Sequence, residues 1–351
     1  MDRFVQLHLL TFYPPSNLNR DDLGRPKTAI VGGFQRLRIS SQSLKRAWRT
    51  SDFFQDALAG NMGVRTKEMG LKVFDDLKKR GIPEAKAKEW AKSVAGIFGK
   101  LKKEQKDAPL QDLEIEQLAH FCPEEMEAIN ELVERLGSAG NGPSRDDLDL
   151  IRKPKRAVDV ALFGRMLAAN PRFNIEAAVQ VAHAFTVNQV TVEDDFFTAV
   201  DDLNNGEDDA GAAHMGETEF GSGLFYLYTC INREILSENL GGDAELTHRA
   251  LAALTESAAK VSPTGKQNSF ASRAYASFIL AEKGSKQPRS LALAFLRPVK
   301  GNDLLGEAVG SLKSCRERMD KVYGKCAAAC IEMNALTGEG SLEEITKFVK
   351  D

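Results

Sequence analysis

The sequence is poor in the residues that build metal centres and disulfide frameworks. It has five cysteines and five histidines among 351 residues, with no C-x-x-C pair and no two histidines three or four residues apart. Without a C-x-x-C pair or closely spaced histidines, neither a zinc site nor a disulfide scaffold is expected. No run approaches the roughly 18 apolar residues of a membrane helix, and the first residues lack a signal-peptide cleavage site. We therefore predict a cytoplasmic protein without metal or cofactor.

Nucleotide-binding and hydrolase signatures are also absent. Gly32-Gly33 is not followed by the Lys-Ser/Thr of a P-loop, and Gly221-Ser222-Gly223 does not fit a nucleophile elbow. A net charge of −3 lacks the basic excess of many nucleic-acid binders. The sequence therefore predicts no catalytic residues, and the distribution of its charge is more informative than the total.

Positive charge is concentrated near the N-terminus. The segment 19–49 contains eight basic and two acidic residues, a local charge of +6, so the rest of the chain carries −9. Scattered charge would serve solubility equally well, whereas a concentrated stretch in an acidic chain is typical of a surface for a polyanion. The alternative is a solvated helix face.

Residue periodicity predicts a strand followed by a helix within this segment. Arg36, Arg38 and Ser40 alternate with apolar residues, so the two arginines are expected on one face of a strand. Ser40 or Ser41 is a candidate N-cap for a helix with an apolar stripe at Leu44, Ala47 and Trp48. Lys45 and Arg49 would then lie four residues apart on its exposed side.

The remaining pattern predicts an α+β fold with a helical insertion. Strand-like alternation occurs at 4–12, 158–162, 179–187, 223–232 and 290–296, whereas 60–142 and 304–350 have helical character. Strands near both ends must share a sheet to hide their apolar faces, which favours a ferredoxin-like or RRM-like core.

The chemistry of residues 36–49 favours a polymer of phosphates as ligand. A helix N-terminus with Ser40, Ser41 and Gln42 offers hydrogen-bond donors and the positive end of the helix dipole to anions. Cations before and after it would extend the contact to successive phosphates. A capped amphipathic helix explains the serines equally well, but it leaves the flanking arginine strand unexplained.

Three further groups of residues have open alternatives. Asp21 and Asp22 are candidates for metal binding or RNA cleavage, or for shaping their loop beside Arg20. Phe196, Phe197 and Val200 lie in the acidic stretch 193–209 and are expected either to wedge between bases or to fold back on the core. Four lysines form either a second nucleic-acid surface facing target DNA or a solvated face: Lys100, Lys102, Lys103 and Lys106.

Several segments resemble the CasC family, the repeated backbone subunit of the type I-E CRISPR surveillance complex called Cascade. They are PSNLNRDD, RLRISSQSLKRAWR, VDVALFGRM, DDFFTAVDDL and TEFGSGLFYLY, in an order and spacing that match from about Phe4 to Gly242. The resemblance implies a hand-like protein with an RRM-like palm, helical fingers and an extended thumb hairpin. It places the palm at 1–59, 176–189 and 223–351, with the C-terminal helices included, the fingers at 60–175 and the thumb at 190–222.

The resemblance also implies a function for individual residues. Several copies would polymerise along a CRISPR guide RNA and leave its bases free to pair with a target DNA strand. Met166, Phe196, Phe197, Thr198 and Val200 would displace a base where the RNA is kinked. Other Cascade subunits, namely the large, small, tail and guide-processing subunits, would be partners. With the chemistry above, the predicted RNA-backbone contacts are Arg20, Lys27, Arg36, Arg38, Ser40, Ser41, Gln42, Lys45, Arg46 and Arg49.

Two other functions remain open from the sequence. A magnesium-dependent endoribonuclease on the same fold would use Asp21 or Asp22, as related backbone subunits in type III CRISPR complexes use an aspartate in an early loop. A scaffold that binds only proteins is the third possibility. We predict a protein that is not an enzyme, because the resemblance is closer to the type I-E subunit.

Overall fold

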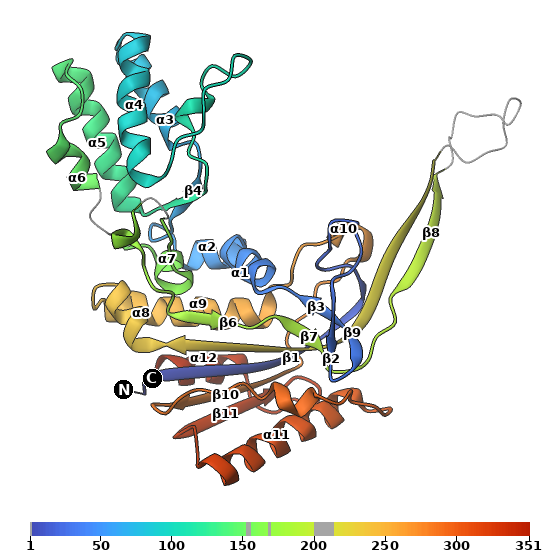
Figure 1. The fold of residues 1–351 in the computed structure, drawn as a ribbon. Helices are drawn as coiled ribbons and strands as arrows, with labels where there is room; N and C mark the ends of the chain where they lie inside the picture. Colours follow the sequence, from blue (N-terminus) through green and yellow to red (C-terminus); the bar gives the residue numbers. More distant parts are fainter. Residues whose placement is uncertain (1, 152–155, 168–169, 200–213) are drawn as a thin grey trace, which may run out of the picture. The chain divides into compact units, whose positions relative to one another are not determined.

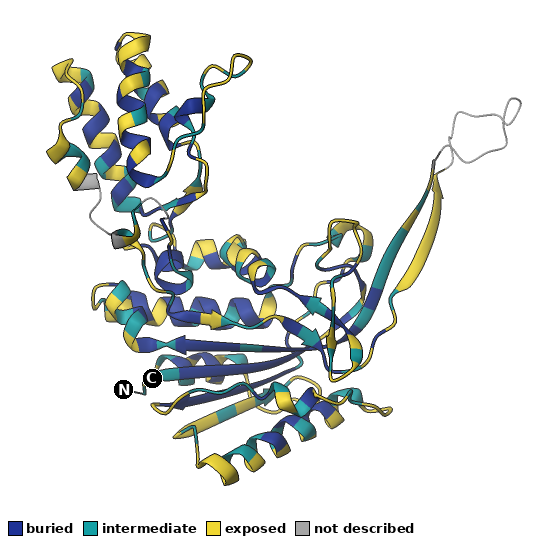
Figure 2. Ribbon diagram, viewed as in Figure 1, coloured by how far each residue is buried: buried dark blue, intermediate teal, exposed yellow. Residues whose placement is uncertain are grey.

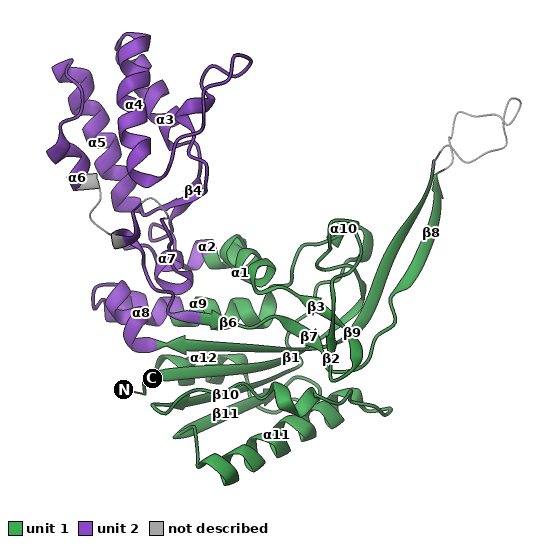
Figure 3. Cartoon of the chain, viewed as in Figure 1, with its two compact units in different colours: residues 1–54, 180–232, 251–351 green, residues 55–179, 233–250 purple. Residues whose placement is uncertain are grey.

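A computed structural model describes residues 2–151, 156–167, 170–199 and 214–351. The chain divides into two compact units (Figure 3). Unit 1 comprises residues 1–54, 180–232 and 251–351, and unit 2 comprises 55–179 and 233–250. Unit 2 therefore includes the segment 233–250, which the domain prediction assigned to the palm.

Unit 1 is an α+β structure built on one large antiparallel sheet (Figure 1). Strands follow each other across the sheet in the order β11-β10-β1-β9-β7-β3-β2, with β6 and β8 also paired to β9. Its strands are β1 (Phe4–Ser16), β2 (Thr28–Val31), β3 (Phe34–Ile39), β7 (Ala184–Thr186), β8 (Glu193–Ala199), β9 (His214–Asn232), β10 (Phe278–Gly284) and β11 (Ala329–Asn334). Its helices are α1 (Ser41–Arg49), α10 (Gln267–Phe270), η3 (Ala292–Phe295), α11 (Leu304–Tyr323) and α12 (Leu342–Lys350).

Unit 2 is mainly helical. Helices α3, α4 and α5 enclose a core that includes Leu77, Val94, Phe121 and Leu136, and β4 and β5 form a small separate sheet. Its elements are β4 (Val64–Thr66), α3 (Met69–Lys79), α4 (Glu84–Phe98), η1 (Gln111–Leu113), β5 (Ala119–Phe121), α5 (Pro123–Ala139), α6 (Arg145–Ile151), α7 (Val158–Phe163), η2 (Pro171–Phe173) and α8 (Arg233–Asn239). Three elements include residues of both units: α2 (Asp52–Ala57), β6 (Val179–Val181) and α9 (Ala244–Lys260).

The predicted α+β class is confirmed, but two predicted strands are wrong. Residues 158–162 belong to helix α7 and are all buried, so no exposed polar face reveals the helical period. Residues 290–296 contain the short helix η3. There Leu291 and Phe295 are fully buried while Leu293 is exposed, which is the four-residue spacing of a helix. The alanines between them made the sequence look like a strand with alternating residues.

Five strands were missed by the sequence analysis, namely β2, β4, β5, β10 and β11. β10 is buried throughout although it contains Glu282 and Lys283, so its charges obscured the strand signal. β11 interrupts the C-terminal segment that was predicted to be helical, β4 and β5 lie within the predicted helical segment 60–142, and β2 lies where no strand was predicted. β1 also continues past Pro14 and Pro15 to Ser16, because its pairing with β9 is irregular between Tyr13 and Ser16 and requires no proline donor there.

One face of the sheet is apolar at one end and polar at the other. At the apolar end, Leu10, Tyr226 and Phe278 pack against Phe295 of η3 and Leu312 of α11. The opposite face carries Lys283, whose Nζ lies 4.3 Å from the ring centroid of Phe348 on α12. The sheet is therefore covered by helices on both faces.

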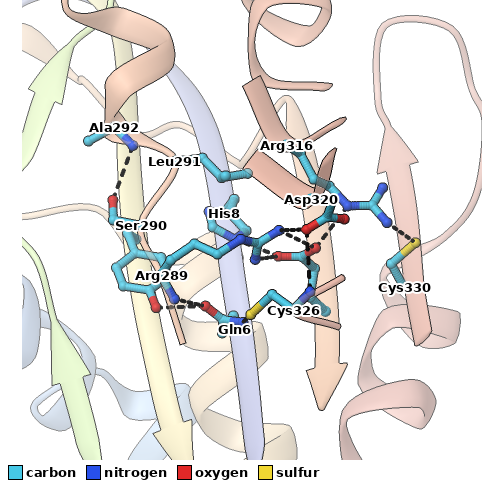
Figure 4. A network of polar contacts seen from close by, with 12 residues as sticks. Gln6, His8, Arg289, Ser290, Leu291, Ala292, Arg316, Asp320, Cys326 and Cys330 are labelled. Atoms are coloured by element: carbon cyan, nitrogen blue, oxygen red, sulfur yellow. Dashed lines mark hydrogen bonds and ion pairs between the residues drawn. The ribbon is translucent and has the colours of Figure 1, made fainter. Parts of the chain in front are cut away.

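The polar end centres on Glu282, whose side chain is fully buried. Figure 4 shows the neighbouring side chains of His8, Arg289, Arg316 and Asp320. Its Oε2 accepts from Arg289 at 2.6 Å and its Oε1 accepts from Arg316 at 2.8 Å. His8 Nε2 lies 3.2 Å from Oε2, and Asp320 accepts from Arg289 at 3.2 Å. The two guanidiniums compensate the buried carboxylate, as a charge removed from water requires.

Burial and charge set the ionisation of this cluster. Burial raises the pKa of Glu282, but hydrogen bonds from His8 and Arg289 outweigh it and lower the pKa to about 2. Burial lowers the pKa of His8 below 6.5 despite the hydrogen bond to Glu282, and the nearby Arg289 and Arg316 act in the same direction. We therefore assign a neutral His8 whose Nε2–H donates to Glu282 and whose Nδ1 accepts from Tyr226 at 2.9 Å.

Unit 1 is expected to lose about 3 kcal/mol of stability from Glu282 as the pH falls from about 4.5 to about 2. The lowered pKa of Glu282 means that the unfolded chain binds the proton first, so this contribution is present above pH 4.5 and lost below. His8 adds to the loss, because its lowered pKa favours protonation of the unfolded chain below pH 6.5. Urea unfolding at several pH values measures the effect.

The two tryptophans make this measurement specific to unit 1. Trp48 is buried in unit 1 and Trp90 lies in unit 2, so Trp90→Phe leaves a single fluorescent reporter of unit 1. In that background, Glu282→Gln should flatten the acid dependence. Glu332→Gln is the matched control, since it removes a half-exposed carboxylate that pairs with Lys313. An unchanged acid slope for Glu282→Gln would contradict the assignment.

Candidate nucleic-acid interface

Helix α1 forms where the sequence predicts it. Ser40 is the N-cap, with extended backbone angles, and its side chain accepts from Ser43 N at 3.2 Å. Leu44, Ala47 and Trp48 are buried, which confirms the predicted apolar stripe. The helix is thereby fixed to unit 1 by one face, and its other face is left to solvent.

The exposed face of α1 carries a compact group of donors. At about 100° per residue, Gln42, Lys45, Arg46 and Arg49 lie within an arc of about 100° on the side away from the core. The first turn contains no acidic residue. Within the parts of the chain that the structure describes, neither Lys45 nor Arg46 pairs with a carboxylate. These charges remain available to an external anion.

A second group of cations is joined to the start of α1 by Asn19. Its side-chain oxygen accepts from Ser40 N at 2.8 Å, and its backbone oxygen accepts from Lys27 N at 2.8 Å. Arg38 N in turn donates to Lys27 O at 2.7 Å, so Lys27, which directly precedes β2, is a neighbour of Arg38 on β3. Lys27, Arg38 and the N-terminus of α1 are therefore held together by two backbone hydrogen bonds and the side chain of Asn19.

His183 is a member of this group that the sequence analysis did not include among the predicted contacts. Its Nδ1 lies 2.6 Å from Arg38 NH1. Partial burial and the charges of Arg38 and Lys27 lower the pKa of His183, so the neutral ring accepts a hydrogen bond from Arg38. The histidine orients the guanidinium without neutralising it.

Arg36 does not belong to this surface, contrary to the prediction. It is fully buried, and its guanidinium donates to Thr186 O at 2.6 Å and to Phe295 O at 3.1 Å. Arg36 and Arg38 do point to the same side of β3, but η3 covers that side at Arg36. Arg36 therefore joins β3 to β7 and η3 and is not available to a ligand.

The two predicted serine contacts are mostly buried as well. Ser40 is 8% exposed and uses its hydroxyl oxygen to cap the helix, and Ser41 is 9% exposed. The Ser40 hydroxyl therefore caps the helix, and burial restricts access to the Ser41 hydroxyl. The predicted residues that stay on the surface are Arg20, Lys27, Arg38, Gln42, Lys45, Arg46 and Arg49.

The loop of Asp21 and Asp22 is shaped by its own backbone. Asp21 Oδ1 accepts from Leu23 N and from Arg25 N, both at 2.9 Å. Arg25 also pairs with Glu219 at 3.4 Å, and Asp22 is exposed. The carboxylate of Asp21 therefore maintains the turn that precedes Lys27.

Unit 2 presents Met166 between two buried neighbours. Met166 is 80% exposed, while Arg165 and Leu167 are 5% and 3% exposed. Arg165 NH1 donates to both carboxylate oxygens of Glu125, at 2.8 and 2.9 Å, and Leu167 N donates to Asn174 at 2.7 Å. These anchors hold an apolar side chain in solvent.

The four predicted DNA-facing lysines of unit 2 are not equivalent. Lys100 pairs with Glu116 at 2.8 Å and Lys102 pairs with Glu114 at 2.5 Å. Lys103 and Lys106 are exposed. Internal pairing thus leaves about half of this positive charge for an external ligand.

The strand β8 is exposed along its whole length (Figure 2). Phe196 is 61% exposed and Phe197 is 42% exposed, and Thr198 follows them. The ring of Phe197 lies over its cross-strand partner Gly216, where an added Cβ would be 2.5 Å from the ring. The predicted thumb residue Val200 lies outside the described residues.

Together the antiparallel sheet and its cationic edge define an α+β protein with an RRM-like unit and a cationic surface. The model of the family described as CT1975-like protein matches residues 5–348, and the chain belongs to this family. No curated protein matches the chain. In the described parts of the chain, no helix is long and apolar enough to cross a membrane.

Two solved structures are similar over nearly the whole chain. One, a chain of a "CRISPR RNA-guided surveillance complex, pre-nicking", is 32% identical with a TM-score of 0.84. The other, a chain of a "CRISPR RNA-guided surveillance complex", is 26% identical with a TM-score of 0.73. In both comparisons 99% of each chain is covered.

Proposed function

We propose that this protein is an RNA-binding subunit of a CRISPR surveillance complex and forms its repeated backbone along a guide RNA. The observation that carries the proposal is the joined group of cations at Lys27, Arg38 and α1. The similar chains are parts of RNA-guided surveillance complexes and cover 99% of this chain, which supports the same assignment. We further propose the type I-E form of Cascade, on the CasC resemblance.

The proposed chemistry separates holding the guide from reading it. Lysine and arginine side chains contact phosphates and carry no sequence information, so one protein serves any guide. The bases stay free to pair with a target DNA strand, which then supplies specificity. Extension of the contact over several residues suits a strand of successive phosphates better than one nucleotide.

Copies of this protein and other Cascade subunits are the proposed partners. The exposed rings of Phe196 and Phe197 and the anchored Met166 are apolar groups that solvent alone does not favour. We propose that they displace a base of the bound RNA at regular intervals, as the resemblance implies. The acidic residues of β8, Glu193, Asp194 and Asp195, are proposed to face the cationic surface of a neighbouring copy.

We propose that the subunit is not catalytic. Asp21 Oδ1 already accepts two backbone hydrogen bonds that shape its loop, which supports a structural function for this residue. Incubating the assembled complex with magnesium and complementary RNA tests the endoribonuclease alternative. Cleavage at regular intervals that is lost in Asp21→Asn or Asp22→Asn would establish the enzyme instead.

The protein purified with its natural neighbours should carry RNA. We expect an absorbance ratio at 260 and 280 nm well above that of protein alone, and bound RNA of uniform length that resists mild nuclease treatment. The same chain expressed without a guide locus is the control. A complex that assembles fully without nucleic acid would instead indicate a scaffold that binds only proteins.

A further inference from the structure

The segment 261–276, between α9 and β10, has an unusual backbone. Lys266 has φ 49° and Ala271 has φ 47°, and these are the only two non-glycine residues with positive φ in the described parts of the chain. Side chains other than glycine are disfavoured there, and such conformations cluster at functional sites. The two residues flank the short helix α10, as its N-cap and its C-cap.

Close packing holds this segment against the loop that follows β1. Gly265 approaches Leu18 so closely that a Cβ would lie 2.3 Å from Leu18 O. Ser272 is fully buried, and Ser262 Oγ both donates to Ala274 O and accepts from Ala274 N at 3.1 Å. The segment is therefore fixed next to Asn19, the residue that joins Lys27 to α1.

The other side of the segment contacts the base of the β8–β9 pair (Figure 1). The ring centroids of Phe270 and Phe220 are 6.0 Å apart, and Lys266 Nζ lies 3.5 Å from Thr218 Oγ1. Both partners belong to β9 and to unit 1. The segment thus connects the surroundings of the cationic surface with the strand pair that carries the exposed aromatic residues.

The segment also lacks negative charge. No acidic residue occurs between Glu256 and Glu282, in a chain with 50 acidic residues among 351. Lys266 and Arg273 make no ion pair with any described residue. Arg273 is exposed and Tyr275 is 69% exposed. An unpaired cation beside an exposed aromatic ring suits a ribose-phosphate chain with unstacked bases.

We propose that segment 261–276 is a second RNA contact, in which Lys266 and Arg273 bind phosphates and Tyr275 stacks on a base. This inference rests on the proposed function. The second contact would extend the binding surface from α1 to the base of the β8–β9 pair. Single-stranded RNA is favoured over an acidic protein segment, because an acidic peptide would make no use of the exposed ring. The strained backbone fixes the positions of these donors before RNA binds.

The test compares Arg273→Gln with Lys321→Gln in the full-length protein, using a 30-nucleotide oligouridine as the probe. Lys321 is an exposed lysine of α11 in the same unit. Arg273→Gln should weaken binding about tenfold and reduce the slope of log K against log salt by about 0.7, whereas Lys321→Gln should change neither. Tyr275→Leu should weaken binding without changing the slope.

The outcomes separate this inference from the proposed function. If Arg273→Gln binds like the unaltered protein while substitutions on α1 weaken binding, the second contact is disproved and the proposed function stands. If substitutions on α1 also have no effect, the proposed function fails. Normal RNA binding with impaired self-association of Arg273→Gln would identify a protein contact and overturn the inference. Cross-linking of 4-thiouridine RNA to Tyr275 would support it directly.

Discussion

Replacing Lys45 and Arg46 together by glutamine is expected to lower the affinity for single-stranded RNA about 100-fold at moderate salt. The two side chains lie on the exposed face of α1 and have no carboxylate partner in the described chain. Removing either phosphate-binding charge should weaken binding by about 1.4 kcal/mol and reduce the salt slope by about 0.7. Fluorescence anisotropy over a range of salt concentrations measures both quantities.

Sequence independence is the second part of this expectation. Two unrelated RNAs of equal length should lose affinity by the same factor, because phosphates are common to all sequences. Arg318→Gln with Lys321→Gln is the matched control, since it removes two exposed cations from another helix of unit 1. A loss confined to one of the two RNAs would mean that α1 reads bases.

The substitution Glu125→Gln is expected to destabilise unit 2 by about 3 kcal/mol or more, because it leaves the buried guanidinium of Arg165 without its counter-ion. Both side chains are almost inaccessible, at 1% and 2%. The glutamine retains an acceptor for Cys122 N, the hydrogen bond that caps α5, so the loss reports the missing charge. Urea unfolding of a Trp48→Phe background, which leaves Trp90 as the reporter, measures unit 2.

A double-mutant cycle separates the ion pair from packing. Arg165→Met should also destabilise unit 2, because it leaves the buried carboxylate of Glu125 without its counter-ion. The combination of Arg165→Met with Glu125→Gln should recover part of the loss, since no buried charge remains unpaired. Strictly additive losses would contradict a coupled pair. Glu134→Gln, which removes an exposed partner of Arg80, is the control and should cost less than about 1 kcal/mol.

Local sequence signals sufficed for α1 and for the overall class. The helix is determined by residues within it, namely the apolar stripe at Leu44, Ala47 and Trp48 and the cap at Ser40. Local sequence is therefore enough to predict it. The α+β class follows from alternation that survives in β1 and β9. The RNA contacts of the other residues stay predictions. Arg36 is the exception, because the structure shows that it is buried.

The errors arise where tertiary contacts decide. Arg36 is buried because η3, far along the chain, places Phe295 O over it, and no local pattern announces this. Glu282 makes β10 look polar, yet Arg289, Arg316 and His8 compensate it. Helix α7 was predicted to be a strand because nearly every residue in it is buried, which leaves no polar face with helical spacing. Buried polar contacts between distant segments are thus what the sequence analysis could not supply.

The pairing of β1 has a consequence for synthesis on the ribosome. Phe4 pairs with Asn232 on one side and with Gly284 on the other. β1 therefore leaves the exit tunnel more than 200 residues before either of the strands with which it pairs. Such long-range pairing slows folding and leaves an apolar strand open to aggregation. Nascent chains of this protein should therefore depend on ribosome-associated chaperones until β10 has been translated.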